Sequence, residues 1–154
     1  MNFKELIKSA KEEALQNAIK LQENVFYTGV IKSANFTTND KDKEIIEIKI
    51  KLTGPEVEGK MVKKTLFIDE SYSEQARKIA FGQFISLVES LTAHTVNEED
   101  NYESLAIKAL GLKDKNVWIK YRKIADKNDP AKYYNQYDIY TKDPNILHDI
   151  TPLK

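Results

Sequence analysis

The segment EIIEIKIKL, residues 44–52, alternates apolar and charged side chains. Such alternation is typical of a β-strand that has one face against a hydrophobic core and the other in water. The residues expected to face the core are Ile46, Ile48, Ile50 and Leu52, and those expected to face water are Glu47, Lys49 and Lys51. The segment therefore predicts a sheet with one wet face.

Further strands are predicted on both sides of this segment. VFYTGVIKSA, residues 25–34, precedes it across a polar loop, 35–43, and Gly29 within it indicates a bulge or a tight bend. A Gly-Pro turn follows residue 52, so KMVKKTLFI, residues 60–68, is expected to return antiparallel. The last two strands are expected in NVWIKYRKI, 116–124, and YYNQYDIY, 133–140.

Three segments have helical rather than strand periodicity. Residues 3–22 form a thin, alanine-rich amphipathic stripe with Asn2 as the expected N-cap. A second helix is expected to begin at Ser73 and to end near Leu91, and a short third one is expected to end at Gly111. The thin stripe of the first helix predicts that it packs against the domain or against a second copy of itself.

The element order is therefore helix, three strands, a helical section and two strands. Three strands, a helix and two strands is the order of the OB-fold, a five-stranded Greek-key barrel whose open face and loops bind oligonucleotides. We expect a β-rich α+β protein: an N-terminal helix in 1–23, an OB-fold-like barrel in 24–142 and a C-terminal tail in 143–154. A generic α+β sheet is the alternative fold.

The fourth predicted strand is the main candidate for binding. Alternation puts Trp118, Lys120 and Arg122 on the face opposite to the core residues Val117, Ile119 and Tyr121. An indole beside two cations suits a base stacked on the ring with phosphates neutralised next to it. Taken singly, each has a simpler role, since a tryptophan more often packs and a lysine on a strand more often only faces water.

Tyrosines and lysines on other strands extend this candidate surface. The fifth strand carries tyrosine on both faces, Tyr133 and Tyr137 on one and Tyr134 and Tyr140 on the other, and the pattern leaves open which pair is exposed. The candidate nucleic-acid-binding residues are Trp118, Lys120, Arg122, Tyr134, Tyr137 and Tyr140, together with Lys49, Lys51 and Lys63 on the second and third strands and the loop residues Phe36 and Lys132.

Composition excludes several classes of function. The chain has 24 basic and 24 acidic residues and no cysteine, so it has neither a thiolate nucleophile nor a sulfur-ligated metal site. Its two histidines are far apart, and it lacks phosphate-binding, dinucleotide-binding, zinc-protease and serine-hydrolase motifs. It has no long apolar run. We expect a cytoplasmic binding protein with no enzymatic activity, cofactor, metal ion or membrane contact.

The chain resembles a family of small bacteriophage proteins regarded as OB-fold single-stranded-DNA-binding proteins. The resemblance covers residues 1–140 and rests on MNFKELIKSAKEEA, FYTGVIKSANFTTND, EIIEIKIKLTGPEVEGKMVKKTLFI, ARKIAFGQFISLVESL and SLAIKALGL, followed by the basic hairpin NVWIKYRKI to YYNQYDIY. It implies a viral protein that coats single-stranded DNA with little sequence preference during phage DNA replication or recombination, in the cytoplasm of an infected or lysogenic bacterium. The tail DPNILHDITPLK lacks the acidic, phenylalanine-tipped end by which many such proteins recruit partners.

Two other functions fit the same residues. A protein-interaction module would bury the aromatic hairpin and the first helix against a phage nuclease or recombinase, or against a second copy of the chain. RNA is the other candidate ligand, because a basic aromatic face binds either nucleic acid.

Overall fold

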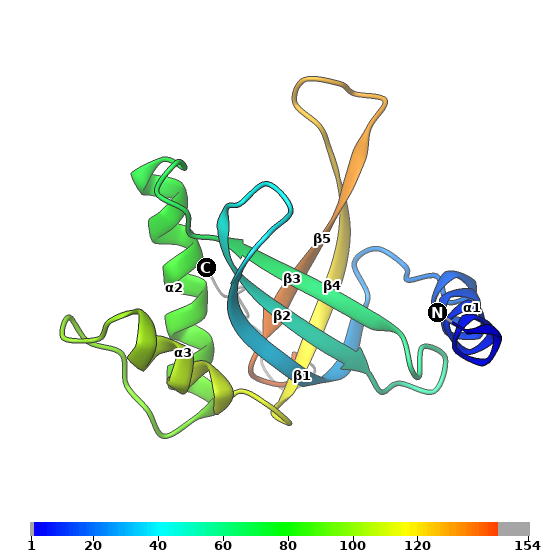
Figure 1. Cartoon of the computed structure of the whole chain (residues 1–154), viewed down its shortest axis with the longest axis horizontal. Helices are drawn as coiled ribbons and strands as arrows, with labels where there is room; N and C mark the ends of the chain where they lie inside the picture. Colours follow the sequence, from blue (N-terminus) through cyan, green and yellow to red (C-terminus); the bar gives the residue numbers. More distant parts are fainter. Residues whose placement is uncertain (1, 145–154) are drawn as a thin grey trace.

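The computed structural model describes residues 2–144, so the predictions for residues 145–154, including His148, lie outside the described residues. The described chain forms a mixed α/β fold of five strands and three helices, as predicted (Figure 1). The strands are β1 (Phe26–Thr38), β2 (Glu44–Leu52), β3 (Met61–Phe67), β4 (Asn116–Ala125) and β5 (Tyr133–Tyr140), and the helices are α1 (Phe3–Ala18), α2 (Glu74–Leu91) and α3 (Tyr102–Leu110).

The strands form one antiparallel sheet in the order β3-β2-β1-β4-β5. β3 and β5 are its two edges, and no ladder joins them within residues 2–144. The sheet is therefore open, and its hydrogen bonds do not close the barrel expected from the element order.

The strand β1 bends the sheet, because it pairs with two neighbours over different parts of its length. Residues 26–30 pair with β4, and residues 29–38 pair with β2. A shift in register between Ile31 and Ser33 marks an irregularity just after the shared stretch. Such a bulge increases local twist, which turns the two halves of the sheet away from each other.

Gly29 lies in the stretch of β1 that both neighbours share, opposite Leu52 on β2 and Val117 on β4. A Cβ atom at this position would lie 2.8 Å from Cγ2 of Ile50 and 3.3 Å from Cδ2 of Leu52. The glycine is therefore required by close packing, and the bulge predicted at Gly29 is found instead at the register shift between Ile31 and Ser33.

The hydrophobic core lies between the inner face of the sheet and the helix α2. The four residues predicted to face the core from β2 are all fully buried, which confirms the alternation. From α2, Phe84, Leu87 and Val88 pack into the same cluster, and α3 adds Ala109. None of the three described helices is both long and apolar enough to cross a membrane.

The helix α1 lies at the opposite end of the sheet from α2 and α3 (Figure 1). Asn2 caps it as predicted, since its Oδ1 accepts a hydrogen bond from the Glu5 amide. The helix ends at Ala18 instead of residue 22, because Ile19 is already extended. None of its residues is buried; the Gln16 side chain holds it to the body by donating to the carbonyl of Gly59 and accepting from the amide of Met61.

The strand β1 is longer than predicted and continues to Thr38, so the loop before β2 is only residues 39–43. Asn39 closes this short loop: its Oδ1 accepts from the amides of Lys41 and Lys43. Polar residues in 35–38 suggested a loop, but the tight turn around Asn39 allows them to pair with β2 instead.

Asp100 anchors the loop between α2 and α3. Its carboxylate accepts hydrogen bonds from the Lys108 ammonium at 2.8 Å, the Asn97 amide at 2.9 Å and the Ser104 hydroxyl at 2.8 Å. The Lys108 hydrogen bond first, and then those from Asn97 and Ser104, lower the pKa of Asp100 to about 2. The ionised carboxylate therefore fixes α3 to the preceding loop.

We expect Gly29→Ala to lower the free energy of unfolding by about 1–3 kcal/mol, because the added methyl group must displace buried Ile50. Urea denaturation followed by circular dichroism measures this. The control is Gly54→Ala, whose added Cβ would meet only Val57, at 3.5 Å. Equal midpoints for the two variants would contradict the proposed packing constraint.

We expect Asp100 to contribute to stability at neutral pH and to lose that contribution in acid. Its folded-state pKa of about 2 lies below the ordinary value of 3.8, so the contribution is complete above pH 3.8 and is lost as the pH falls to about 2. Denaturation midpoints between pH 7 and pH 2 should fall less steeply for Asp100→Asn than for the wild type. Parallel curves for the two proteins would refute this assignment.

Candidate nucleic-acid interface

The strand β4 presents its two faces as predicted. Val117, Ile119 and Tyr121 are buried, and Trp118, Lys120 and Arg122 lie on the other face, each of them half-buried. Trp118 lies opposite Thr28 on β1 and Tyr140 on β5. The indole is thus neither sealed in the core nor fully open.

Arg122 is bound to an acidic residue. Its Nε and Nη2 atoms donate to the two carboxylate oxygens of Asp138 at 2.8 Å and 3.2 Å, and Gln136 donates to the same carboxylate at 3.1 Å. Asp138 is buried, so its charge needs this partner. The guanidinium therefore has a structural role and less capacity for a phosphate than the sequence indicated.

The pairing of β4 with β5 settles which tyrosines share the face of Trp118. Tyr140 lies opposite Trp118, and Tyr134 lies opposite Ile124, which is on the same face of β4 as Trp118. Tyr137 instead lies opposite the buried residue Tyr121. Tyr140 is buried, and burial, followed by the charge of Asp138, raises the pKa of its phenol. Of the three predicted tyrosines, only Tyr134 is both on that face and exposed.

Tyr137 belongs to the inner face of the sheet. Its ring lies 5.6 Å from that of Tyr121, and burial, followed by the neighbouring Tyr121, raises its pKa. The Tyr121 hydroxyl donates to Oδ1 of Asn135 at 2.7 Å. The side chain is nevertheless not fully buried, and it lines a hollow described below.

Phe26 joins the β4 face, although the sequence analysis did not single it out. It lies opposite Lys120, whose Nζ is 5.3 Å from the centre of the Phe26 ring, and its ring meets that of Tyr140 edge-on. The same period-two alternation that was applied to β4 would have placed Phe26 beside it, once β1 and β4 were known to pair.

The lysines of β2 and β3 form a separate patch. Lys49 and Lys63 lie opposite each other and share the carboxylate of Glu47, at 3.6 Å and 3.8 Å. Lys51 is exposed further along β2. Lys49 lies opposite Ser33 on β1 and Trp118 lies opposite Thr28, so Lys49 and Lys63 are separated from Trp118 by about 16 Å along β1 at ~3.3 Å per residue, whereas Lys51, opposite Val30, is nearer.

The two predicted loop residues have different positions. The expectation that Phe36 lies in a loop is wrong: it lies on β1, and its ring packs edge-on against Phe84 and Tyr102, each at 5.2 Å. Lys132 is an exposed loop residue, as predicted. The structure therefore assigns Phe36 to packing between β1, α2 and α3.

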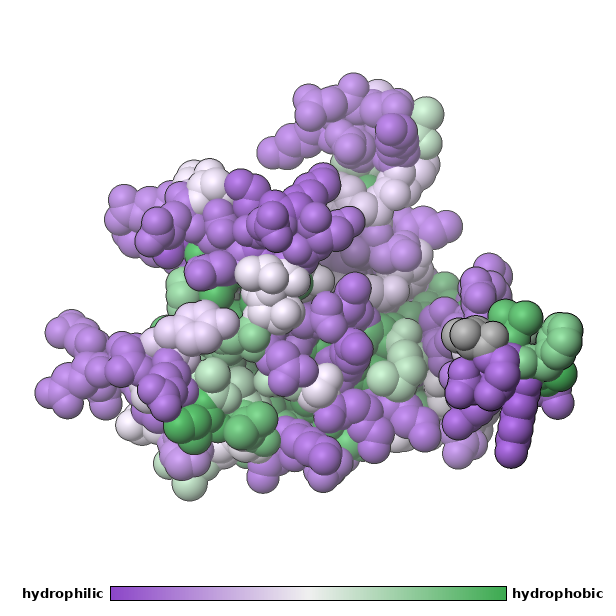
Figure 2. Space-filling view, in the orientation of Figure 1, coloured by the Kyte–Doolittle hydropathy of each residue, from purple (hydrophilic) through white to green (hydrophobic). Residues whose placement is uncertain are grey.

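The hairpin formed by β4 and β5 projects well beyond the rest of the sheet (Figure 1). Its exposed rings are Tyr133 and Tyr134, which are 65% and 52% accessible, and its exposed cations are Lys123, Lys127 and Lys132. The two acidic residues of its loop organise the turn: Asp126 accepts from the Asn128 amide and Asp129 from the Ala131 amide. The end of the hairpin is hydrophilic in Figure 2.

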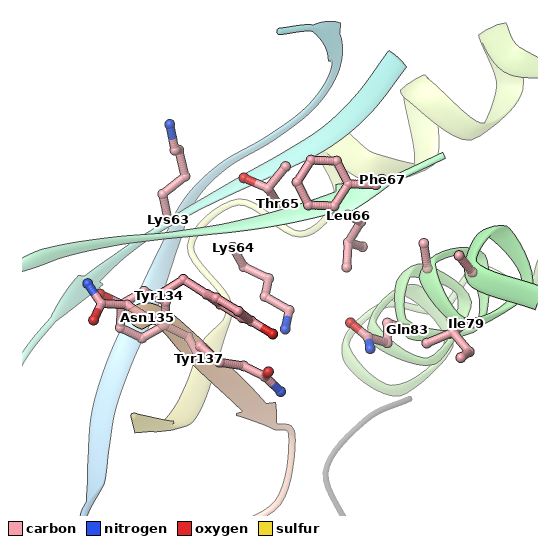
Figure 3. A pocket seen from close by; sticks show the side chains of 13 residues that line it. Lys63, Lys64, Thr65, Leu66, Phe67, Ile79, Gln83, Tyr134, Asn135 and Tyr137 are labelled. Atoms are coloured by element: carbon pink, nitrogen blue, oxygen red, sulfur yellow. The ribbon is translucent and has the colours of Figure 1, made fainter. Parts of the chain in front are cut away.

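A hollow of about 580 Å³ lies where β3 and β5 approach each other, bordered on its third side by α2 (Figure 3). Lys64 and Phe67 line it from β3, Tyr134 and Tyr137 from β5, and Gln83 from α2. Neither aspartate nor glutamate is among the described residues of its lining.

Lys64 is the residue that the sequence analysis missed. It follows Lys63 in a lysine pair, and alternation turns one of the two inward: Lys64 lies opposite the core residue Ile48. Figure 3 shows Lys64 directed across the hollow towards Gln83, while Lys63 points to the other side of β3. Burial lowers the pKa of Lys64, with the charge of Asp138 acting in the opposite direction and that of Arg122 in the same one.

No group of three or more histidine, aspartate or glutamate residues within 2–144 has the arrangement of a metal site. Comparison of the chain with known protein families and with curated proteins finds no match. The geometry therefore supplies the case for function.

We expect Arg122→Met to lower the free energy of unfolding by about 1–3 kcal/mol, because it leaves the buried Asp138 carboxylate without its cation. Lys120→Met is the matched control: it removes the same charge from the same face and breaks no ion pair. Urea denaturation at pH 7 compares the two variants. Equal losses would show that the Arg122–Asp138 pair has no special structural role.

Proposed function

We propose that the protein binds single-stranded DNA with little sequence preference, through base stacking on exposed rings and phosphate contacts to lysines. The observation that carries this proposal is the projecting β4–β5 hairpin. It combines exposed Tyr133 and Tyr134 with Lys123, Lys127 and Lys132, while Asp126 and Asp129 are engaged with backbone amides. Rings interleaved with unpaired cations are the components of a sequence-tolerant single-strand binder.

The strand order supports an OB-like interpretation of the open sheet. β1 is shared between β2 and β4, and β3 approaches β5 at the place where an OB barrel would close. In that fold, the loops after β1 and after β4 flank the ligand, and here both loops extend in the same direction from the sheet (Figure 1). The resemblance to phage single-stranded-DNA-binding proteins agrees with this placement and suggests a role in phage DNA replication or recombination, inside the bacterial host.

The face of β4 contributes a second stacking surface. Trp118 remains partly accessible, and Lys120 lies over the Phe26 ring, close to the path of a strand leaving the hairpin. Lys51 lies opposite Val30, about 7 Å along β1 from Thr28 at ~3.3 Å per residue. Lys49 and Lys63 are too far along β1 to act on the same nucleotides as Trp118. They serve instead a more distant part of a longer strand.

The exposed apolar side of α1 favours a second candidate function, a protein-interaction module that binds a further copy of the chain. Phe3, Leu6 and Ile7 fall on one side of α1, and Phe3 is 84% accessible. Apolar residues are visible on the outer side of α1 in Figure 2. In this reading the hairpin would bind protein and not DNA.

Titration with a polythymidine oligonucleotide tests the first proposal. We expect quenching of the Trp118 fluorescence, with a log-log salt slope of about −2 to −3 if three or four phosphates are neutralised. Tyr133→Ala should weaken binding by about 1–3 kcal/mol through the loss of one stacked base. Lys132→Gln should make the slope less steep by about 0.7.

Phe3→Ala is the matched control, because it removes an exposed ring that lies on α1, away from the hairpin. Its oligonucleotide affinity should equal that of the wild type. Duplex DNA should bind more weakly than the single strand. An absence of binding at low salt, together with a concentration-dependent sedimentation coefficient that Phe3→Ala lowers, would favour the interaction module.

A further inference from the structure

The gap between β3 and β5 has unusual chemistry for the edge of a sheet. Both strands present unpaired backbone groups towards it, because no ladder joins them in the described chain. Exposed edges of this kind are normally covered or blocked, since they recruit other strands. Here the two edges approach each other and enclose space instead.

A second hollow, of about 460 Å³, adjoins the first one along β5. It lies between β4 and β5 on one side and, on the other, the end of α1 with the chain that follows it and Lys60, which directly precedes β3. It shares Asn135 and Tyr137 with the hollow beside Lys64. The two hollows therefore follow one another along the β3–β5 gap, with Asn135 and Tyr137 between them. Each has a volume in the range of small-ligand sites, about 300–1,000 Å³.

Both hollows are lined by cations without acids. Within residues 2–144, their linings contain no aspartate or glutamate and include five lysines, Lys63 and Lys64 in the first and Lys20, Lys60 and Lys123 in the second. Of these, only Lys63 has a carboxylate within 4.0 Å, that of Glu47. Lys63 points away from the first hollow, whereas the charges of Lys60 and Lys20 repel each other in the second. Such repulsion is unfavourable unless an anion occupies the space.

Two of these lysines, Lys64 and Lys60, are partly buried. Lys64 projects from the inner face of β3 and makes no hydrogen bond or ion pair in the described chain. Lys60 is fixed by a bond from its Nζ to the carbonyl of Gln16, at 2.7 Å. Burial lowers the pKa of both amines, so each ammonium has lost hydration that a bound phosphate would replace.

Accepting the single-strand binding proposed above, we infer that the β3–β5 gap is where the strand lies deepest, with two consecutive nucleotides in its two hollows. Lys64 and Lys60 contact their phosphates, and Tyr137 separates the two bases. The amides of Gln83 and Asn135 offer both donors and acceptors, which suits base edges of any sequence. The hairpin guides the strand into this gap by way of Tyr134, which lines the first hollow.

The first test measures dT12 affinity against salt for Lys64→Met and Lys60→Met. Each variant should bind about tenfold more weakly, as expected for the loss of one charge-assisted bond. Each should also lose about 0.7 from the magnitude of the log-log salt slope. Lys113→Met is the matched control, because Lys113 is an exposed lysine outside both hollows. It should retain the wild-type slope and affinity.

The second test uses the wild-type protein, so that it does not depend on the folding of a variant. Brief acetylation followed by mass spectrometry should show that dT12 protects Lys64 and Lys60 several-fold and leaves Lys113 unprotected. Thymidine monophosphate at millimolar concentration should protect the same two lysines if the hollows accept a free nucleotide, whereas protection by dT12 alone assigns them to a continuous strand.

Two failures can be told apart. If dT12 binds the wild type, but Lys64 and Lys60 stay unprotected and their variants match Lys113→Met, the gap is not the binding track, while the hairpin proposal stands. If dT12 does not bind the wild type at low salt, both proposals fail.

Discussion

The bend of β1 is the constraint on which the rest of the structure depends. One strand hydrogen-bonds to β2 over most of its length and to β4 over its first residues, and the two ladders overlap at Gly29 and Val30. At this overlap three strands and the side chains of Ile50 and Leu52 compete for the same space, which only a residue without a Cβ leaves free. Because β1 turns here, the outer strands are carried round until β3 and β5 face each other.

This geometry determines which charges are available at the surface. The sequence suggested Arg122 as a phosphate ligand together with Lys120, yet Arg122 lies beside Asp138 and is committed to it. Lys64 looked like one half of an ordinary lysine pair, yet the same curvature places it at the opening between the sheet edges. The arginine is therefore paired with a buried acid, whereas the linings of the two hollows contain no acid among the described residues.

Periodicity was enough to predict the eight elements, the inward set of β2 and the two faces of β4. It failed where the answer depends on pairing between strands. The β4–β5 register places Asp138 opposite Lys120 and Gln136 opposite Arg122, so Arg122 reaches Asp138 diagonally across the two strands. No local pattern in the sequence specifies that register. Phe36 was taken for a loop residue because polar neighbours surround it, whereas packing against Phe84 and Tyr102 keeps it in β1. Which tyrosines of β5 share a face with Trp118 likewise follows only from the pairing of β5 with β4.

The way Gln16 holds α1 has a consequence for handling the protein. Its side-chain amide accepts from the Met61 amide and donates to the Gly59 carbonyl, so it imitates a peptide unit of a neighbouring strand. The Gln16 side chain therefore satisfies the backbone groups at the start of β3 as a neighbouring strand would. Removal of α1 would expose these backbone groups at the start of β3, and the shortened protein would self-associate through this unpaired strand edge.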